Sequence, residues 1–308
     1  MAKMSQTVKD ITQIVVFLLV VGILLLVFVI YPLNRTKNIL ARPDADNLNP
    51  DSLPPNDVSA LVDLPAVIDT FRVDADGLTS LACVYLSPVS DSGKPEVPQG
   101  LVVLLHDERQ DRNAMLPLAR VLLDSGLAVC LYDQRASGRS SGVYHGDGEY
   151  EAADLSEVIA FLRIRDRVKS PFVMVGQRAG ADAALLSARS DPPPDGVVAI
   201  RPFLTTERWL DILMDEHDMY WIPFPHTIFM FWYELRSGYA PEGRSLETIR
   251  PPRCRTLILD TEDRLADETV SAYKQLSNGL IATAPLPGDS DRLIDTVIAF
   301  IRAASTVR

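Results

Sequence analysis

The sequence predicts an α/β protein with a doubly wound, mostly parallel sheet, preceded by one transmembrane helix. Short apolar runs of strand length alternate with segments of helical periodicity over the C-terminal two thirds of the chain. This alternation is typical of a parallel sheet that is covered by helices on both faces. The transmembrane helix is predicted by the apolar run Ile11–Leu33, in which Tyr31 is the one ionisable residue. About 20 such residues are needed to cross the hydrocarbon core of a bilayer.

We interpret the apolar run as an uncleaved anchor. A cleaved signal peptide has a shorter apolar region that is followed closely by a small-x-small site, whereas the nearest candidate, Leu40-Ala41, is far from the run. Lys and Arg residues are nearly balanced on the two sides, so they hardly discriminate between orientations. A short polar tail before a first hydrophobic segment favours a cytoplasmic N-terminus. We therefore expect a single-pass membrane protein that contacts the lipid bilayer through residues 11–33, with an extracytoplasmic soluble domain.

The anchor is predicted over residues 1–34, and a linker rich in Pro, Asp and Asn follows over residues 35–64. The formal charge of −11 and the lack of clustered Lys and Arg argue against a nucleic-acid partner. Three cysteines lie in or beside apolar strand patterns and are expected to be buried free thiols. No Cys-x-x-Cys or His-x-x-x-His spacing occurs, so neither a metal nor a cofactor is predicted.

The soluble domain is predicted over residues 65–308. Two alternating runs around Asp76-Gly77 predict a β-hairpin. Continuous apolar runs predict buried parallel strands, and amphipathic spacing predicts the helices between them. The further predicted strands are QGLVVLLHDE, LAVCLYDQR, PFVMVG, DGVVAI, RCRTLILDTEDR and residues 280–285. The predicted helices are NAMLPLARVLLDSG, YEAADLSEVIAFLRIRD, the small-residue segment that begins in GQRAG, and DRLIDTVIAFIRAAS.

Five motifs occur in a fixed order along this domain. They are VVLLHDE at residues 102–108, YDQRASGRSSG at 132–142, GQRAG at 176–180, LILDTEDR at 257–264 and LPGDSDRLIDTVIAFI at 286–301. Together they resemble the α/β-hydrolase superfamily, in its serine aminopeptidase-like, membrane-anchored bacterial branch. The resemblance covers roughly residues 66–304 and implies the α/β-hydrolase fold, with a site at the carboxyl ends of the strands.

The same resemblance implies that the catalytic residues are substituted. In the family a Ser at the strand-to-helix elbow attacks a carbonyl, a His removes its proton and a carboxylate orients the His. Here Arg178 occupies the Ser position and Asp291 the His position. The acid position is best matched by Asp263, with Asp260 and Asp267 as alternatives. Arginine is protonated at neutral pH and has no free lone pair, so Arg178 cannot be the nucleophile.

The oxyanion-hole positions implied by the resemblance are Asp107 and Ala179. A carboxylate at Asp107 would repel the negative charge that this site must stabilise. His106 and His145 are expected at the rim of the pocket. Because the nucleophile, the base and the electrostatics all fail, we predict a catalytically inactive protein that acts in binding or scaffolding. The alternative is an active esterase or peptidase with a non-standard active site.

Arg178 itself needs partners, since a buried guanidinium without a counter-charge is costly. We predict that it bridges at least one of Asp263 and Asp291 in a structural network. The alternative is that Arg178 binds a small anionic ligand, a carboxylate or phosphate. A protein partner is the other candidate for a binding role.

The segment over about residues 203–250, where the family inserts a lid, is crowded with aromatic residues, among them Trp221 and Trp232. We interpret it as a lid helix that packs on the domain core. The alternative is that an apolar face of this segment contacts the bilayer or a partner.

Overall fold

The computed structural model describes residues 6–41, 58–90, 92–108, 110–238, 243–245 and 250–305. The chain divides into two compact units. The first consists of Met1–Pro43 and Leu210–Ala240, and the second of Asp44–Trp209 and Pro241–Arg308. Residues 210–240, which we predicted as part of the domain over residues 65–308, group instead with the N-terminal helix.

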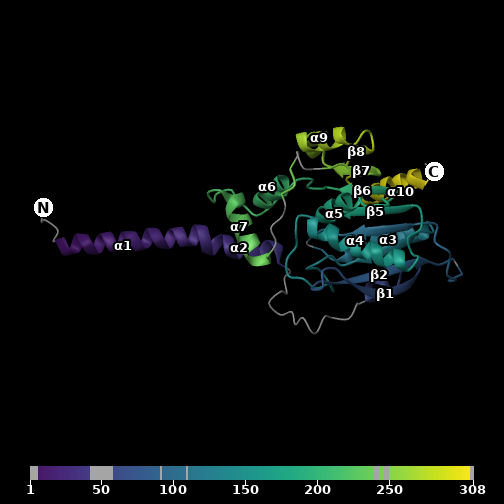
Figure 1. Ribbon diagram of the computed structural model, residues 1–308, viewed down its shortest axis with the longest axis horizontal. Helices are drawn as coiled ribbons and strands as arrows, with labels where there is room; N and C mark the ends of the chain where they lie inside the picture. The colour runs from purple at the N-terminus through teal and green to yellow at the C-terminus, as the bar shows by residue number, and fades with distance from the viewer. Residues whose placement is uncertain are drawn as a thin grey trace. The chain divides into compact units, whose positions relative to one another are not determined.

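The second unit is built on one sheet of eight strands in the order β1-β2-β4-β3-β5-β6-β7-β8 (Figure 1). Strand β2 pairs antiparallel with both β1 and β4, and the pairs from β4 across to β8 are parallel. The predicted doubly wound, mostly parallel sheet is confirmed. The strands are β1 (Ala66–Asp74), β2 (Ser80–Pro88), β3 (Leu101–Leu105), β4 (Ala128–Tyr132), β5 (Phe172–Gln177), β6 (Gly196–Ile200), β7 (Arg255–Asp260) and β8 (Ile281–Pro285).

The hairpin of β1 and β2 turns where the sequence predicts it. Asp76 accepts hydrogen bonds from the backbone N–H groups of Leu78 (3.0 Å) and Thr79 (2.6 Å), which is the local side-chain bonding that favours Asp in turns. Gly77 has φ 77°, a left-handed conformation that glycine adopts without steric cost. The turn thereby fixes the register in which Asp74 faces Ser80.

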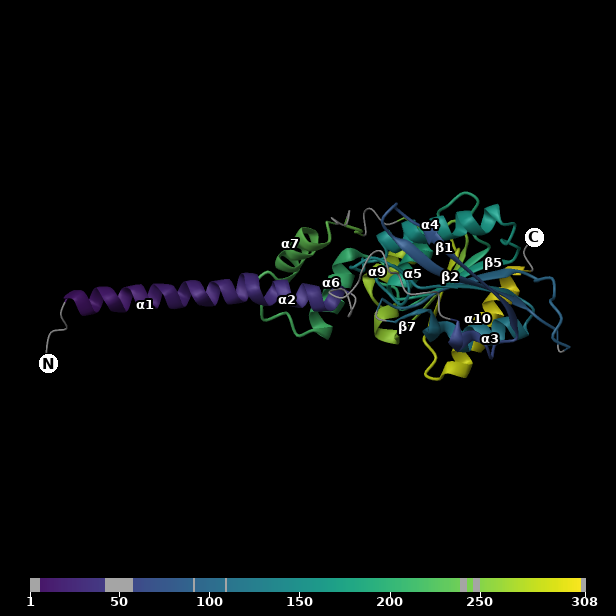
Figure 2. The same cartoon turned by 90° about the horizontal axis from the view of Figure 1, so that it is seen from below.

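Helices cover both faces of the sheet, as Figure 2 shows with α4 on one side and α3 and α10 on the other. Residues of α4, α5 and α9 belong to one buried apolar cluster, and residues of α3 and α10 to a second. The helices of this unit are α3 (Leu116–Asp124), α4 (Glu149–Ile164), α5 (Ala179–Ser187), α8 (Glu262–Leu265), α9 (Glu268–Leu276) and α10 (Ser290–Ser305), with short 3₁₀ turns η3 (Ser59–Leu61) and η4 (Arg112–Met115).

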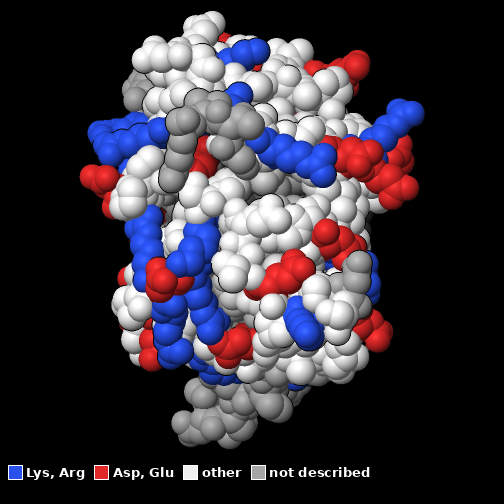
Figure 3. Space-filling view, turned by 90° about the vertical axis from the view of Figure 1, so that its right-hand side faces the viewer, with Lys and Arg blue, Asp and Glu red and all other residues white. Residues whose placement is uncertain are grey.

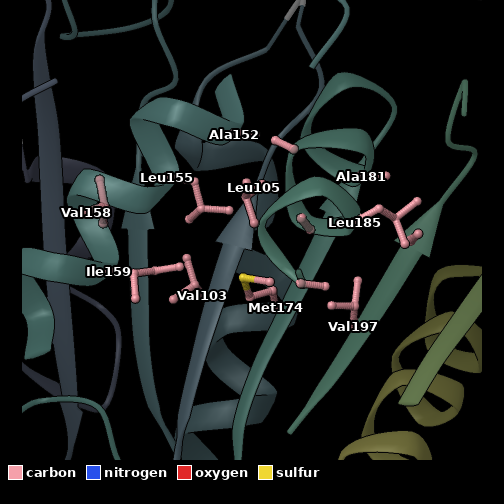
Figure 4. Packing of buried hydrophobic residues seen from close by; sticks show 14 of the residues in the cluster. Val103, Leu105, Ala152, Leu155, Val158, Ile159, Met174, Ala181, Leu185 and Val197 are labelled. Carbon is pink, nitrogen blue, oxygen red and sulfur yellow. The ribbon is translucent and has the colours of Figure 1, made fainter. Parts of the chain in front are cut away.

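Strand β3 shows why the central strands are continuous apolar runs. Leu101, Val103 and Leu105 belong to the cluster under α4 and α5, while Val102 and Leu104 belong to the cluster on the opposite face. Successive side chains of a strand point to opposite faces, so a strand covered on both sides must be apolar at every position. Figure 4 shows Val103 and Leu105 packed among side chains of α4, α5 and the neighbouring strands.

The surface of the second unit mixes charges of both signs. On the face seen in Figure 3, Lys and Arg side chains lie beside Asp and Glu side chains and among uncharged atoms. Exposed pairs such as Lys169 with Asp166, at 2.9 Å, contribute little to stability because solvent screens them.

The first unit contains a continuous helix formed by α1 (Gln6–Leu25), a π-helical turn η1 (Leu26–Ile30) and α2 (Tyr31–Leu40). The stretch Val8–Leu40 is long and apolar enough to cross a membrane. The helix runs on to Leu40, so residues 35–40, which were predicted as linker, are helical. The predicted linker otherwise falls mostly on residues 42–57, which lie outside the described residues.

Helix α7 (Pro225–Ser237) packs against α2. It belongs to the first unit together with most of α6 (Thr206–Glu216), which begins in the second unit. The interpretation of the aromatic segment as a lid helix that packs on the domain core is therefore wrong for α7. The physical reason is that its aromatic residues find partners on the N-terminal helix, where the Trp232 indole donates to the carbonyl oxygen of Phe28 at 3.1 Å.

Candidate functional site

The candidate site lies at the carboxyl end of β5, where the chain turns sharply into α5. Arg178 is the residue at this turn, with φ 49° and ψ −116°. A positive φ is strained for any residue that carries a side chain, and such strain concentrates at functional turns. The strand–turn–helix predicted from GQRAG is thus present, with Arg178 at the turn.

Both glycines of the elbow are required by close packing. A Cβ on Gly176 would lie 2.2 Å from the carbonyl oxygen of Gly180, and a Cβ on Gly180 would lie 2.6 Å from the carbonyl oxygen of His106. No side chain fits at either position without displacing backbone. The close packing of the elbow therefore requires glycine on both sides of the turn at Arg178.

The Arg178 side chain is buried, with 8% of the residue exposed. Its Nε and one terminal nitrogen donate to Oε1 of Glu108 at 3.0 and 2.9 Å. Nε also lies 3.4 Å from Oδ1 of Asp107. The guanidinium carbon lies 5.0 Å from the centre of the Phe203 ring, within the range of a cation–π interaction. The guanidinium is therefore held by carboxylates that follow β3.

Glu108 occupies the position that would stabilise an oxyanion. Its second oxygen, Oε2, accepts a long hydrogen bond from the backbone N–H of Ala179 at 3.5 Å. In a working elbow this N–H, at the start of the helix after the nucleophile, stabilises the negative charge of the reacting oxygen. Here the chain provides its own anion at that place, and the neighbouring Arg178 neutralises it.

Asp107 and Glu108 titrate as an unequal pair. Burial, together with the hydrogen bond and negative charge of Glu108, raises the pKa of Asp107 to about 8, against the opposing charge of Arg178. Burial also acts to raise the pKa of Glu108, but the hydrogen bond from Asp107 and the charge and hydrogen bonds of Arg178 outweigh it and lower this pKa to about 2. At neutral pH the group is a protonated Asp107, an ionised Glu108 and a guanidinium, so its net charge is zero.

The predicted bridge from Arg178 to Asp263 or Asp291 is wrong. Asp263 lies in the first turn of α8 and Asp291 in the first turn of α10, and both residues are exposed. Each follows its strand by enough residues to lie on the outer surface of a helix start. Glu108, directly after the end of β3, is the carboxylate that reaches the guanidinium.

The buried acid at the end of β7 is Asp260, which the sequence left as an alternative to Asp263. Asp260 is fully buried, and its Oδ2 lies 3.3 Å from Nε of Arg264 and 3.7 Å from a terminal nitrogen of Arg208. The third alternative, Asp267, caps α9 by accepting from the N–H of Thr269. Asp260, the buried carboxylate at the end of β7, therefore has Arg208 and Arg264 as its neighbours.

These arginines form a positively charged group around Asp260. Burial and the charges of Arg208, Arg201 and Arg178 lower the pKa of Arg264 to about 10, although Asp260 acts to raise it. Arg208 is buried, and its second terminal nitrogen has no hydrogen-bond partner among the residues that the structure describes. We call Arg178, Arg201, Arg208 and Arg264 the arginine cluster. Arg178 lies within salt-bridge distance of Asp107 and Glu108. Arg208 and Arg264 lie within salt-bridge distance of Asp260 and also interact with the charge of Asp267.

His106 and His145, which the sequence analysis expects at the rim of the pocket, are both buried. The Nδ1 of His106 donates to the carbonyl oxygen of Asp107 at 2.6 Å, and its Nε2 accepts from the backbone N–H of Gln134 at 2.9 Å. Burial lowers the pKa of His106, which keeps the ring neutral. Because Nε2 links the end of β3 to the end of β4 and Nδ1 is held by the adjacent Asp107 carbonyl, His106 has a structural role and is not available as a base.

The serines of the YDQRASGRSSG loop are also used structurally. Ser140 donates to the carbonyl oxygen of Asp133 and accepts from the N–H of Ala82 at 2.8 Å. Ser141 accepts from the N–H of Ser80 at 2.7 Å. Both hydroxyls tie the loop to β2, so neither is positioned as a nucleophile beside an imidazole.

A second buried ionic network surrounds Arg244. It lies where the chain leaves the sheet domain after Thr206 and returns to it. Arg244 donates to Oδ1 of Asp182 at 2.6 Å and lies 3.3 Å from Oδ2 of Asp147. The N–H of Thr206 donates to the carbonyl oxygen of Arg244 at 3.0 Å, and the N–H of Arg244 donates to the hydroxyl of Thr206 at 3.0 Å. The departing and returning ends of the segment are therefore joined at one point, which we call the neck.

Sequence reasoning missed Glu108, Arg208 and Arg264. Glu108 stands in VVLLHDE next to the oxyanion position, so an acidic residue one place beyond Asp107 was an available signal. Arg208 and Arg264 had no motif of their own. Among the described residues, no group of three or more His, Cys, Asp or Glu side chains could hold a metal ion.

An eight-stranded sheet in this order, with a strand–turn–helix elbow after its fifth strand, defines an α/β-hydrolase fold. Residues 96–223 match the family model of serine aminopeptidase, S33. The chain is also similar to uncharacterized protein YqkD of Bacillus subtilis (strain 168), with 28% identity over 174 residues. This match covers 55% of the chain and 56% of the relative, a little over half the length of each.

Solved structures agree on the fold. The esterase Pf2001 of Pyrococcus furiosus superposes with a TM-score of 0.60 at 17% identity, covering 83% of this chain and 94% of the other. A proline iminopeptidase from Mycobacterium smegmatis superposes with a TM-score of 0.55 at 11% identity, covering 77% and 99%. The chain therefore has the α/β-hydrolase fold, and residues 96–223 resemble the serine aminopeptidase family within it.

Proposed function

We propose that this chain is a membrane-anchored α/β-hydrolase-fold protein without hydrolase activity, whose site binds a small anionic ligand. One observation carries the first half of this proposal. The residue at the elbow is a guanidinium, and the carboxylate of Glu108 that pairs with it also accepts from the Ala179 N–H that would stabilise an oxyanion. A substrate carbonyl would find neither an attacking oxygen nor a free donor.

The anchor is supported by the apolar helix Val8–Leu40, whose 33 residues exceed the length that a bilayer requires. The short polar segment before it favours a cytoplasmic N-terminus, which puts the sheet domain on the extracytoplasmic side. A cleaved signal sequence also contains an apolar helix near the N-terminus. The mass of the membrane-bound chain distinguishes the two cases, because an anchored chain keeps this helix and a cleaved chain has lost it.

The ligand class follows from the arginine cluster. The planar fork of a guanidinium matches carboxylate and phosphate groups. Arg208 has a buried terminal nitrogen without a hydrogen-bond partner in the described part of the chain, and Arg201 is exposed. Burial, together with the charges of the other three members of the cluster, lowers the pKa of Arg264. An anion at the carboxyl ends of β6 and β7 would satisfy the Arg208 donor and offset those charges.

Loss of hydrolysis is tested on the full chain in detergent, with a short-chain aryl ester and a fluorophosphonate probe. We expect neither turnover nor labelling. A variant that carries Arg178→Ser and Glu108→Gly places a hydroxyl at the elbow and frees the Ala179 N–H. Asp291 is exposed at the start of α10 and is left unchanged. Because no imidazole is added, the expected result is slow labelling of this variant at residue 178, with the Arg178→Ala chain as the unlabelled control. Labelling of the wild-type chain at any serine would favour the alternative of an active, non-standard hydrolase.

Anion binding is tested by titration calorimetry with inorganic phosphate and with citrate. Binding that weakens in Arg201→Gln and Arg208→Gln, while Arg120→Gln on the opposite face of the sheet binds as wild type does, supports the proposal. Equal affinities in all four chains would contradict it. Thermal unfolding of each variant establishes that a loss of binding is not a loss of fold.

A further inference from the structure

Helix α7 is apolar on two opposite faces. Phe229 and Tyr233, four residues apart, form its fully buried face, and α7 packs against α2 within the first unit. On the other face, Phe224 at the start of the helix is 76% exposed, Phe231 is 59% exposed and Leu235 is 64% exposed. A helix in water carries polar residues on the face that does not pack, whereas a helix that is apolar all round is buried in protein or in lipid.

The spacing shows that this second face is one continuous stripe. Positions 224, 231 and 235 follow the i, i+7, i+11 pattern of a single helix face, and the half-buried Ile228 at i+4 completes it. The central part of α7 reads Ile-Phe-Met-Phe-Trp-Tyr over residues 228–233, without a polar residue. The first charged residue after it is Glu234, close to the C-terminal end of the helix.

The contacts of this segment fix its depth along the N-terminal helix. The Trp232 indole donates to the carbonyl oxygen of Phe28 in the π-helical turn, where the regular hydrogen-bond ladder is interrupted. The Trp221 ring meets the Tyr31 ring edge to face at 4.9 Å. Phe28 lies five residues before Leu33, the end of the apolar run, which corresponds to about 8 Å along the helix axis.

That depth is the boundary between hydrocarbon and headgroups. Trp and Tyr are enriched at this level of a bilayer because their rings are apolar and their N–H or O–H groups are polar. Arg35 and Lys37 follow within one to two turns, where they reach the headgroups. A helix held against the last turns of a membrane span therefore has lipid, rather than water, next to its outer face.

We propose that α7 lies in the bilayer interface beside the membrane-spanning helix, with Phe224, Phe231 and Leu235 in contact with lipid acyl chains. The occupant of the exposed apolar stripe is the bilayer itself, because α7 is held at Phe28, where the span also exposes apolar side chains such as Leu26 and Ile30. This inference rests on the membrane anchor of the proposed function and does not depend on the loss of hydrolase activity.

The test uses an environment-sensitive thiol fluorophore on the full chain, reconstituted in vesicles of phosphatidylcholine and phosphatidylglycerol. The three native cysteines are buried and burial raises their pKa, so an added exposed cysteine reacts selectively. The fluorophore is attached in turn to Phe231→Cys, to Leu19→Cys in the middle of the span, and to Val97→Cys on an exposed loop of the sheet domain. Quenchers are lipids that are spin-labelled either near the headgroup or near the end of the acyl chain.

At position 231 we expect blue-shifted emission and a larger loss of fluorescence to the shallow quencher than to the deep one. Position 19 should respond more to the deep quencher, and position 97 should emit as in water and respond to neither. Water-like emission at 231, with deep quenching retained at 19, would overturn the interfacial position of α7 while the anchor stands. Blue-shifted emission without lipid quenching at 231 would also overturn it, because protein would then cover the stripe. Loss of quenching at 19 would contradict the anchor itself.

Discussion

Removing both carboxylates from the Arg178 site isolates the cost of its buried charge. The guanidinium is 8% exposed and has Glu108 and Asp107 within salt-bridge distance. In the double variant Glu108→Gln/Asp107→Asn the charge of Glu108 is removed and residue 107 can no longer ionise to replace it, while the side-chain shapes are retained. Breaking a buried ion pair by removing one side costs about 3–5 kcal/mol, which for a domain of this size lowers the melting temperature by roughly 10 °C.

The single variant Glu108→Gln should cost much less. Without the charge of Glu108 beside it, the raised pKa of Asp107 falls, so Asp107 ionises and takes over as the partner of Arg178. Arg178→Met added to the double variant should recover most of the lost stability, because an apolar side chain of similar length needs no counter-charge.

The pH dependence of the free energy of unfolding tests the protonation states of Asp107 and Glu108 independently. In the wild-type chain the pKa of Asp107 is raised to about 8, so the folded state holds a proton that the unfolded state loses near its ordinary pKa of about 4. The contribution of Asp107 therefore falls as pH rises from about 4 to about 8. The lowered pKa of Glu108 acts with the opposite sign and only below its ordinary value of about 4.3.

Calorimetric melting temperatures between about pH 5 and pH 8 are compared for wild type and Glu108→Gln, since Glu108 stays ionised throughout this range. Burial also shifts the pKa of Glu151, Asp154, Asp182 and His106, so the difference between the two profiles reports the Asp107 contribution. The decline with rising pH should be smaller in Glu108→Gln than in wild type. If Glu108→Gln were as damaging as the double variant, or if both chains had the same pH profile, the assignment of a protonated Asp107 beside an ionised Glu108 would be refuted.

Three further outcomes follow from contacts described above. Gly180→Ala should destabilise the sheet domain by about 2 kcal/mol or more, because its Cβ would lie 2.6 Å from the carbonyl oxygen of His106; Gly22→Ala, where nothing lies within 4 Å, is the matched neutral change in a thermal melt. Arg244→Met should cost about 3–5 kcal/mol by leaving Asp182 buried without its cation, and faster proteolysis at the neck would accompany it; a melting temperature equal to wild type would contradict the role of this network. The three native thiols should react with a maleimide only after denaturation, as their burial and raised pKa require, so rapid modification of the native chain would show that a strand core is open.

Much of the sheet domain is predictable because short sequence segments determine its strands and its elbow. Strands buried on both faces must be apolar throughout, so the strands from β3 to β7 are visible as short apolar runs, whereas the edge strand β8 is partly exposed. The elbow is visible because two glycines are required within five residues by close backbone contact. Arg178 could be placed at its centre from the sequence alone.

The partners of Arg178 could not be predicted in the same way. Asp263 and Asp291 align with family positions, but each lies at the start of a helix on the outside of the domain, and a shift of a few residues decides between a buried and an exposed carboxylate. Asp260, three residues earlier, ends the strand itself and is buried. Helix periodicity likewise identifies α7 as apolar but does not say which apolar face meets the N-terminal helix and which one stays uncovered.

The neck has a consequence for how this chain can be altered. The Thr206 N–H and hydroxyl are hydrogen-bonded to the backbone of Arg244, so the two ends of the intervening segment touch. A detour whose two ends touch imposes no distance on the rest of the chain, so replacing Leu210–Ala240 by a short turn should put little strain on the sheet domain. Arg208 and Trp209 must be kept in such a variant, because Arg208 pairs with Asp260 and Trp209 is buried.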